Sequence, residues 1–199
     1  LYAASLENDP AKKAEIYKKA AELNSDDYRA YNNLGMMAYA NGDLATAENY
    51  FKQAASKNAN AAEVNTNLGL IELTKGNVAN AETYLSKSTG ANTANEALGN
   101  LYIKQGQYDR AVQAFGDTKT NSAALAQILA KDYNKAKSTL SAVKNPDAYT
   151  NYLMAVVGAR TNNADLVKSS MDKVKQQDAA LAAKAQNDRE FAKYANEVK

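Results

Sequence analysis

A repeated motif with a spacing of 34 residues constrains the fold of this chain more than any other feature. Gly69 follows Gly35 at that spacing, and each glycine follows a leucine and precedes a second glycine, an alanine and a large apolar residue. Self-similarity at a period of this length is typical of helical repeat proteins. The copies contain Leu34, Gly35, Gly42, Ala47 and Phe51; Leu68, Gly69, Gly76, Ala81 and Leu85; and Leu98, Gly99, Gly106, Ala111 and Phe115.

Apolar residues within each copy recur at helical spacing on both sides of the second glycine, which predicts a helix, a turn and another helix. Glycine suits that turn because it ends a helix at positive φ without steric cost. The sequence therefore predicts an all-α fold, an α-solenoid of antiparallel helix pairs. The helix pairs are expected at residues 28–40 and 44–57, at 62–75 and 78–87, and at 95–105 and 108–116.

The remainder of the chain keeps the alternation of helix and turn more loosely. Residues 1–27 are interpreted as a truncated first repeat, 28–116 as three full repeats, 117–175 as two degenerate repeats and 176–199 as a capping hairpin with its second helix at 188–198. Because each unit of a stacked array contacts mainly its neighbours, residues 1–199 are expected to form a single repeat domain.

The spacing of Tyr31, Leu34-Gly35, Ala38, Ala47 and Phe51 resembles the tetratricopeptide repeat. The resemblance is specific over residues 28–116 and loose elsewhere. It implies a right-handed superhelix with a concave groove lined by the first helix of each pair. This chain departs from the pattern where Asn65, Asn95 and Glu72 replace aromatic residues, and we expect looser filling at those points.

Three glycines in the middle of the first helices need a physical reason, because glycine there costs about 1 kcal/mol relative to alanine. Close contact between the two helices of a pair would recover that cost. Gly35, Gly69 and Gly99 are therefore assigned to packing, as are the alanine and the large apolar residue that follow each of them on the second helix.

The composition gives no support for an enzyme. The chain has no histidine and no cysteine, so histidine-based triads, thiolate nucleophiles and the usual zinc sites cannot form within it. The paired carboxylates Asp26 and Asp27 fall in a predicted loop without metal-ligand spacing. We therefore expect no enzymatic activity, no cofactor and no metal.

The charge gives no reason to expect a nucleic-acid partner or insertion into a membrane. The formal net charge is only +2, with a slightly acidic first half and a basic second half. An RNA-stacking surface on the tyrosines of the second half is a weaker alternative, because their spacing follows helix packing. No apolar run approaches the roughly 18 residues that a bilayer requires.

The resemblance also implies which residues face a ligand. Some members of the family clamp a C-terminal carboxylate with two lysines, an arginine and asparagines. This chain has Asn32, Met36 and Glu96 where the clamp would need lysine, asparagine or a lysine- or arginine-like side chain, so that mode is not expected. A softer, partly apolar groove for a peptide is expected instead. Its lining would come from Arg29, Asn32, Asn33, Met36, Tyr39, Glu63, Thr66, Asn67, Leu70, Asn100 and Lys104.

Asn33 and Asn67 occupy the same position in two repeats and are the most informative members of that set. An exposed amide offers a donor and an acceptor together, which can pair with the backbone of an extended peptide. The alternative is that asparagine before Leu-Gly serves packing alone.

The sequence thus predicts a non-enzymatic scaffold that binds a protein or peptide in its concave groove. The alternative is an assembly module that packs through its ends or convex face. The sequence identifies neither the partner nor the oligomeric state. The chain begins at Leu1, so we expect it to be a fragment of a longer or processed chain, and its cysteine-free, asparagine- and lysine-rich composition favours an exported bacterial protein, periplasmic or outer-membrane-associated.

Overall fold

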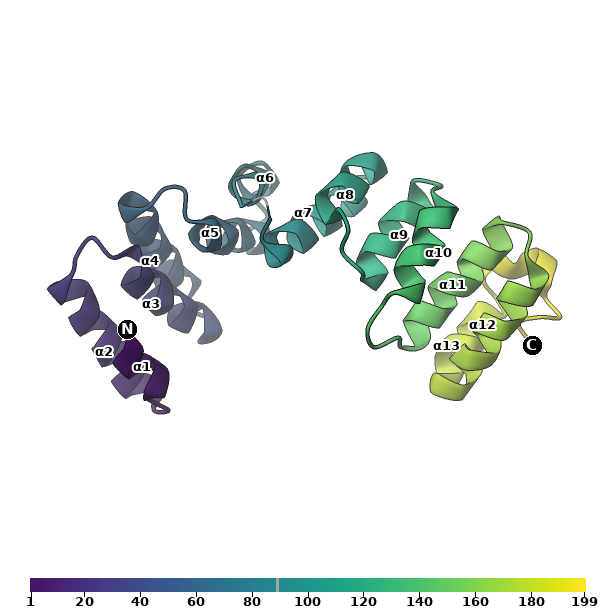
Figure 1. Ribbon diagram of the computed structural model, residues 1–199, viewed down its shortest axis with the longest axis horizontal. Helices are drawn as coiled ribbons and strands as arrows, with labels where there is room; N and C mark the ends of the chain where they lie inside the picture. Colours follow the sequence, from purple (N-terminus) through teal and green to yellow (C-terminus); the bar gives the residue numbers. More distant parts are fainter. Residues whose placement is uncertain (89) are drawn as a thin grey trace. The chain divides into compact units, whose positions relative to one another are not determined.

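The computed structural model describes residues 1–88 and 90–199 (Figure 1). It divides into two compact units, Leu1–Ala97 and Leu98–Lys199. The first contains α1 (Tyr2–Leu6), α2 (Pro10–Leu23), α3 (Tyr28–Ala40), α4 (Leu44–Lys57), α5 (Ala62–Thr74), α6 (Val78–Ser86) and the start of α7 (Asn92–Lys104). The second contains the rest of α7, α8 (Tyr108–Phe115), α9 (Asn121–Leu129), α10 (Tyr133–Ser141), α11 (Ala148–Arg160), α12 (Ala164–Gln177), α13 (Ala179–Ala185) and the 3-10 helix η1 (Arg189–Tyr194).

Neighbouring helices pack in pairs within each unit. In the first unit α3 packs against α4 and α5 against α6; in the second, α9 packs against α10 and α11 against α12. The described residues contain helices and no strands. The predicted all-α solenoid of helix pairs is confirmed.

The turn inside each pair has one hydrogen-bonding pattern. In the α3–α4 turn, Gly42 has φ of 78°. Its N–H donates to the carbonyl of Tyr39, and the N–H of Asp43 donates to the carbonyl of Ala38. These two bonds form a Schellman motif, which satisfies carbonyls at the end of the helix. Asp43 then caps α4, because its Oδ1 accepts from the N–H of Thr46 at 3.1 Å.

The glycine in the middle of each first helix makes room for a large side chain on the second. A Cβ added at Gly35 would lie 2.5 Å from the ring of Phe51. Gly99 stands in the same relation to Phe115, and Gly69 to Leu85. Phe51, Phe115 and Leu85 are all buried. The predicted close contact between the helices of a pair is confirmed.

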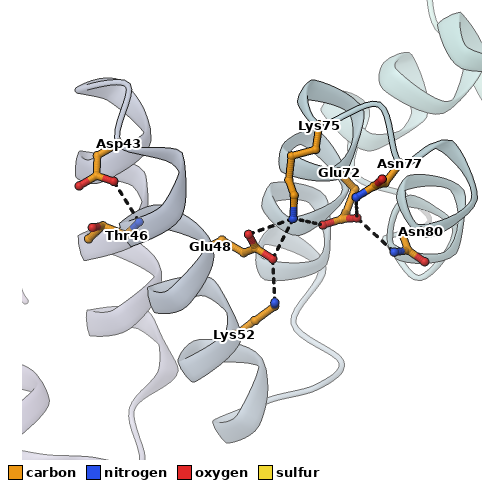
Figure 2. A network of polar contacts seen from close by, with 8 residues as sticks. All are labelled: Asp43, Thr46, Glu48, Lys52, Glu72, Lys75, Asn77 and Asn80. Carbon is orange, nitrogen blue, oxygen red and sulfur yellow. Dashed lines mark hydrogen bonds and ion pairs between the residues drawn. The ribbon is translucent and has the colours of Figure 1, made fainter.

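The expected looser filling at Asn65 and Glu72 is wrong, because both side chains are buried and hydrogen-bonded. Asn65 Nδ2 donates to the carbonyls of Ala59 and Ala61 at 3.0 and 3.1 Å. Glu72 Oε2 accepts from Asn77 at 2.9 Å and from Asn80 at 3.2 Å (Figure 2). A buried polar group that is fully hydrogen-bonded avoids the cost of desolvation, so polar side chains can occupy aromatic positions.

Lys75 joins the first two full repeats through two carboxylates (Figure 2). Its Nζ lies 3.1 Å from Glu48 Oε2 on α4 and 3.2 Å from Glu72 Oε1 on α5. Burial raises the pKa of Glu72, but the hydrogen bonds from Asn77, Asn80 and Lys75 outweigh burial and hold it below its usual value. Hydrogen bonds from Lys52 and Lys75 likewise lower the pKa of Glu48. Both carboxylates therefore stay charged at neutral pH.

Two predicted helix boundaries need correction. Helix α7 begins at Asn92 rather than at residue 95. The predicted helix at 188–198 is not an α-helix: η1 is a 3-10 helix with non-helical dihedral angles at Phe191. Phe191, Tyr194 and Val198 are nevertheless buried in the core of the second unit. The last segment is therefore held by side-chain packing and not by an amphipathic α-helix.

Candidate binding surface on helices α3 and α5

Nine of the eleven residues predicted to line a groove lie on α3 and α5 of the first unit, and the other two, Asn100 and Lys104, are exposed on α7 in the second unit. The two helices lie close enough for their side chains to bond directly. We use the name α3–α5 face for the surface formed by Asn32, Asn33, Met36, Tyr39, Glu63, Asn67 and Leu70.

Two hydrogen bonds cross from α3 to α5. Asn67 Nδ2 donates to Asn32 Oδ1 at 2.9 Å. One turn towards the start of both helices, the hydroxyl of Tyr28 donates to Glu63 Oε1 at 2.6 Å. The hydrogen bond to Glu63 raises the pKa of Tyr28. Both bonds join residues 35 positions apart.

The two asparagines with equivalent sequence positions have different environments. Asn67 is bonded to Asn32, so the partner of each amide is a neighbouring amide within the face. The side chain of Asn33 has no hydrogen-bond partner among residues 1–88 and 90–199 and is half-buried. The two amides predicted to face a ligand therefore differ, because Asn67 is held by Asn32 whereas Asn33 is not held by another side chain of the described residues.

Two other predicted residues are less available than expected. Thr66 is only 6% exposed, and its hydroxyl donates to the carbonyl of Ala62 at 2.8 Å. Its prediction as a lining residue is wrong, because the side chain turns back onto its own helix. Arg29 is exposed but forms two bonds to Asp27, from Nε at 2.8 Å and from Nη2 at 2.7 Å. Arg29 in turn holds the pKa of Asp27 below its usual value.

A small apolar cavity opens in the α3–α5 face. It has a volume of about 60 Å³ and is lined by Met36, Tyr39, Phe51, Asn67 and Leu70. Met36 is 46% exposed and Tyr39 37% exposed, which is high for large apolar side chains. Four of the five lining residues were predicted from the sequence, so the structure brings these four together.

Comparison with known protein families agrees with the geometry of the helix pairs. Tetratricopeptide repeat models match residues 16–49, 38–96 and 95–119. The chain belongs to the tetratricopeptide repeat family. Tetratricopeptide repeats form a scaffold for protein interactions, and the predicted resemblance is confirmed. No curated protein matches the chain in sequence.

Several solved structures share the fold. YrrB, described as a TPR protein with an unusual peptide-binding site, matches with a TM-score of 0.67 and 21% identity over 86% of this chain and 99% of its own. PilF of Pseudomonas aeruginosa matches with a TM-score of 0.70 and 14% identity over 94% of this chain and 90% of its own. PilW, a type IV pilus biogenesis factor, matches with a TM-score of 0.60 and 19% identity over 96% of this chain and 90% of its own. Identities this low show a shared fold and not a shared ligand.

The corresponding face of α11 is covered by the chain itself. The turn after α11 has the same hydrogen bond as the turn after α3: the N–H of Asn163 donates to the carbonyl of Gly158, as the N–H of Asp43 donates to that of Ala38. When the two repeats are aligned on these turns, Tyr152 corresponds to Asn32 and Val156 to Met36. The hydroxyl of Tyr152 donates to Asp188, and its ring meets Phe191 edge-on at 5.6 Å. Val156 is only 8% exposed.

Sequence reasoning missed two residues of the first unit that shape the face. Phe51 was assigned to the core, yet it also lines the cavity. Tyr28 was treated as the start of a helix, yet its hydroxyl binds Glu63. The sequence contained a signal for Tyr28: it lies one turn before Asn32 on the first helix of its repeat, so its hydroxyl is a polar group beside the next repeat.

The described residues contain no group of three or more acidic residues that could hold a metal ion, and none of their helices is both long and apolar enough to cross a membrane.

Proposed function

We propose that this chain is a non-enzymatic scaffold that binds an extended peptide segment of a partner protein on the α3–α5 face. The observation that carries the proposal is the bonded pair Asn32–Asn67 beside the exposed side chains of Met36 and Tyr39. Polar groups with fixed directions next to an accessible apolar patch are the usual composition of a peptide site.

The asparagine pair can serve a peptide backbone because the mutual bond uses only part of its capacity. An amide side chain has two N–H donors and an oxygen with two lone pairs, so both residues retain free donors and acceptors. Each residue of an extended peptide also offers one donor and one acceptor. The bond between Asn32 and Asn67 restricts both side chains before a ligand arrives, which lowers the entropy lost on binding.

The similarity to YrrB is consistent with the proposal, since that protein is described as having a peptide-binding site. The corresponding face of α11 is covered, whereas the α3–α5 face is exposed, so we assign the peptide site to the first unit.

We predict that Asn32→Ala combined with Asn67→Ala weakens peptide binding about 30-fold, because two backbone-directed hydrogen bonds of about 1 kcal/mol each are lost. Peptides are first selected on the immobilised wild-type chain from a phage-displayed library of random linear peptides. Fluorescence anisotropy of the selected, labelled peptides then gives the dissociation constants.

The matched control is Asn49→Ala, which removes an exposed amide on α4. It should leave the affinity within twofold, and circular dichroism melts should show that both variants fold. Selected peptides that bind the double variant as tightly as the wild type would exclude the α3–α5 face as their site.

A second candidate function is supported by apolar residues at the start of the chain. Tyr2 is 80% exposed and Leu23 is 89% exposed, and Leu6 is also exposed. Exposed large apolar side chains on α1 and α2 are typical of an interface. They favour an assembly role in which this end of the first unit packs against another domain or another copy.

If the end of the first unit is such an interface, the wild-type chain should self-associate as its concentration rises, and Leu6→Ser combined with Leu23→Ser should prevent association. Light scattering after size-exclusion chromatography measures the mass. The helical content should not change, because neither side chain is buried. A wild-type chain that stays monomeric at millimolar concentration would argue against self-assembly through this end.

A further inference from the structure

The cavity in the α3–α5 face limits the side chain that a ligand can place there. Its lining is apolar, with the ring of Phe51 and the side chains of Met36 and Leu70, and only Asn67 contributes an amide. Phe51 cannot move aside, because it is buried and its ring lies against Gly35. A charged group would lose its hydration there without a partner, so the cavity suits an aliphatic side chain.

The volume of the cavity limits the size of the side chain that a ligand can place there. A cavity of about 150 Å³ accommodates a benzene ring, whereas this one has about 60 Å³. An aromatic side chain of a ligand therefore does not fit. At the same scale of about 25 Å³ per carbon atom, the cavity holds two or three carbon atoms, so a side chain of the size of valine fits.

The charge on the face is negative at one position. Glu63 bonds to the neutral hydroxyl of Tyr28 and has no cationic partner among residues 1–88 and 90–199. The nearby Arg29 is neutralised by Asp27. The face therefore presents one uncompensated carboxylate, which is complementary to a basic side chain.

The spacing of these two features sets the register of a ligand. Glu63 and Leu70 are seven residues apart on α5, which is about 10 Å along a helix that rises 1.5 Å per residue. A polyproline II peptide rises about 3.1 Å per residue and turns once every three residues, so side chains three positions apart lie on one side at about 9 Å. The two distances agree.

We infer that the α3–α5 face recognises an extended peptide with one small aliphatic side chain in the Met36–Leu70 cavity and one basic side chain, three residues away, at Glu63. This inference rests on the proposed function and adds the chemistry of the ligand to it. The backbone between the two side chains passes the Asn32–Asn67 pair, because Asn67 lies between Glu63 and Leu70 on α5.

The test uses the full chain and two labelled peptides, Lys-Ser-Pro-Val and Val-Pro-Ser-Lys, each flanked by serines so that both chain directions are covered. We expect one of them to bind in fluorescence anisotropy. Replacing its valine with aspartate or tryptophan, or its lysine with glutamate, should weaken binding at least tenfold at low salt.

Compensating variants distinguish specific contacts from general loss. Glu63→Lys should reverse the charge preference and favour the peptide in which glutamate replaces lysine. Leu70→Ala should enlarge the cavity and admit a phenylalanine in place of the valine. Glu22→Gln, an exposed change on α2, is the matched control and should have no effect on either preference.

The outcomes separate this inference from the proposed function. If library-selected peptides depend on Asn32 and Asn67 but ignore the charge at residue 63 and the size at residue 70, the peptide site stands and the ligand chemistry is wrong. If neither Lys-Ser-Pro-Val nor Val-Pro-Ser-Lys binds at millimolar concentration, the ligand chemistry is also wrong. If no selected peptide depends on the asparagine pair, both fail together.

Discussion

Replacing Phe51 with alanine is expected to lower the free energy of unfolding by about 3–5 kcal/mol, because it leaves a cavity in a core that cannot fully collapse. Phe51 is buried at the centre of a cluster that includes Ala47, Val64 and Leu68. Urea denaturation followed by circular dichroism measures the change. Asn49→Ala on the exposed side of the same helix is the control and should change stability by less than about 0.5 kcal/mol.

Gly35, which lies against the ring of Phe51, allows a second test of the same contact. Gly35→Ala should destabilise the chain although alanine is the better helix former by about 1 kcal/mol, because the new Cβ would lie 2.5 Å from the Phe51 ring. In the variant that already carries Phe51→Ala, the ring is absent, so the same glycine change should stabilise the helix. Equal effects of Gly35→Ala in both backgrounds would show that contact with the ring does not explain the glycine.

The packing within a repeat could be predicted from the sequence because it repeats. Gly35, Gly69 and Gly99 are each followed by an alanine and a large apolar residue at similar distances, and three occurrences of a costly mid-helix glycine require a common steric reason. The structure supplies that reason in the contacts with Phe51, Leu85 and Phe115. These contacts are local, so no knowledge of how repeats stack was needed.

The contacts between repeats were not predictable in the same way. Asn32 and Asn67 are one residue out of register with the 34-residue spacing, so aligning the repeats pairs Asn67 with Asn33 instead of with its true partner. The tilt of α5 relative to α3 decides which residues meet, and the sequence does not contain that angle. The same reasoning applies to Thr66, which the alignment places at the surface but whose hydroxyl bonds to its own helix.

Glu72 shows a second limit of sequence reasoning. A carboxylate at an aromatic position suggests a gap, but Asn77, Asn80 and Lys75 surround it with donors (Figure 2). Asn77 comes from the turn and Asn80 from α6, and Lys75 is shared with Glu48 on the preceding repeat. The bonds of such a network strengthen one another and join residues from three helices and a turn, so no single residue predicts it.

The C-terminal segment is a third part of the chain whose structure the sequence pattern did not predict. Residues 188–198 have helical spacing of apolar residues, but the structure folds only Arg189–Tyr194 as a helix, a 3-10 helix that packs against α11. Tertiary contacts here override local preference. Asp188 accepts from the hydroxyl of Tyr152, and Arg160 pairs with Glu190, with Nη2 lying 2.8 Å from Oε2. Burial and the bond to Asp188 raise the pKa of Tyr152, so its hydroxyl remains a donor at neutral pH.

Phe191→Ala is expected to destabilise the second unit by about 3–5 kcal/mol and to free the segment after Asp188. Phe191 is buried and belongs to the same core cluster as Leu153, Met171 and Val198. Hydrogen exchange measured by mass spectrometry should show faster exchange in residues 188–199, and urea denaturation should show the loss of stability.

The matched variant Tyr152→Phe distinguishes packing from hydrogen bonding as the source of that stability. It removes only the hydroxyl that donates to Asp188 and keeps the ring that meets Phe191 edge-on. A hydrogen bond to a charged group contributes about 1.5–3 kcal/mol, so this variant should cost less than Phe191→Ala. If Tyr152→Phe costs as much as Phe191→Ala or more, the polar contacts hold the segment. If Phe191→Ala costs more, packing of the aromatic ring fixes the segment over the face of α11.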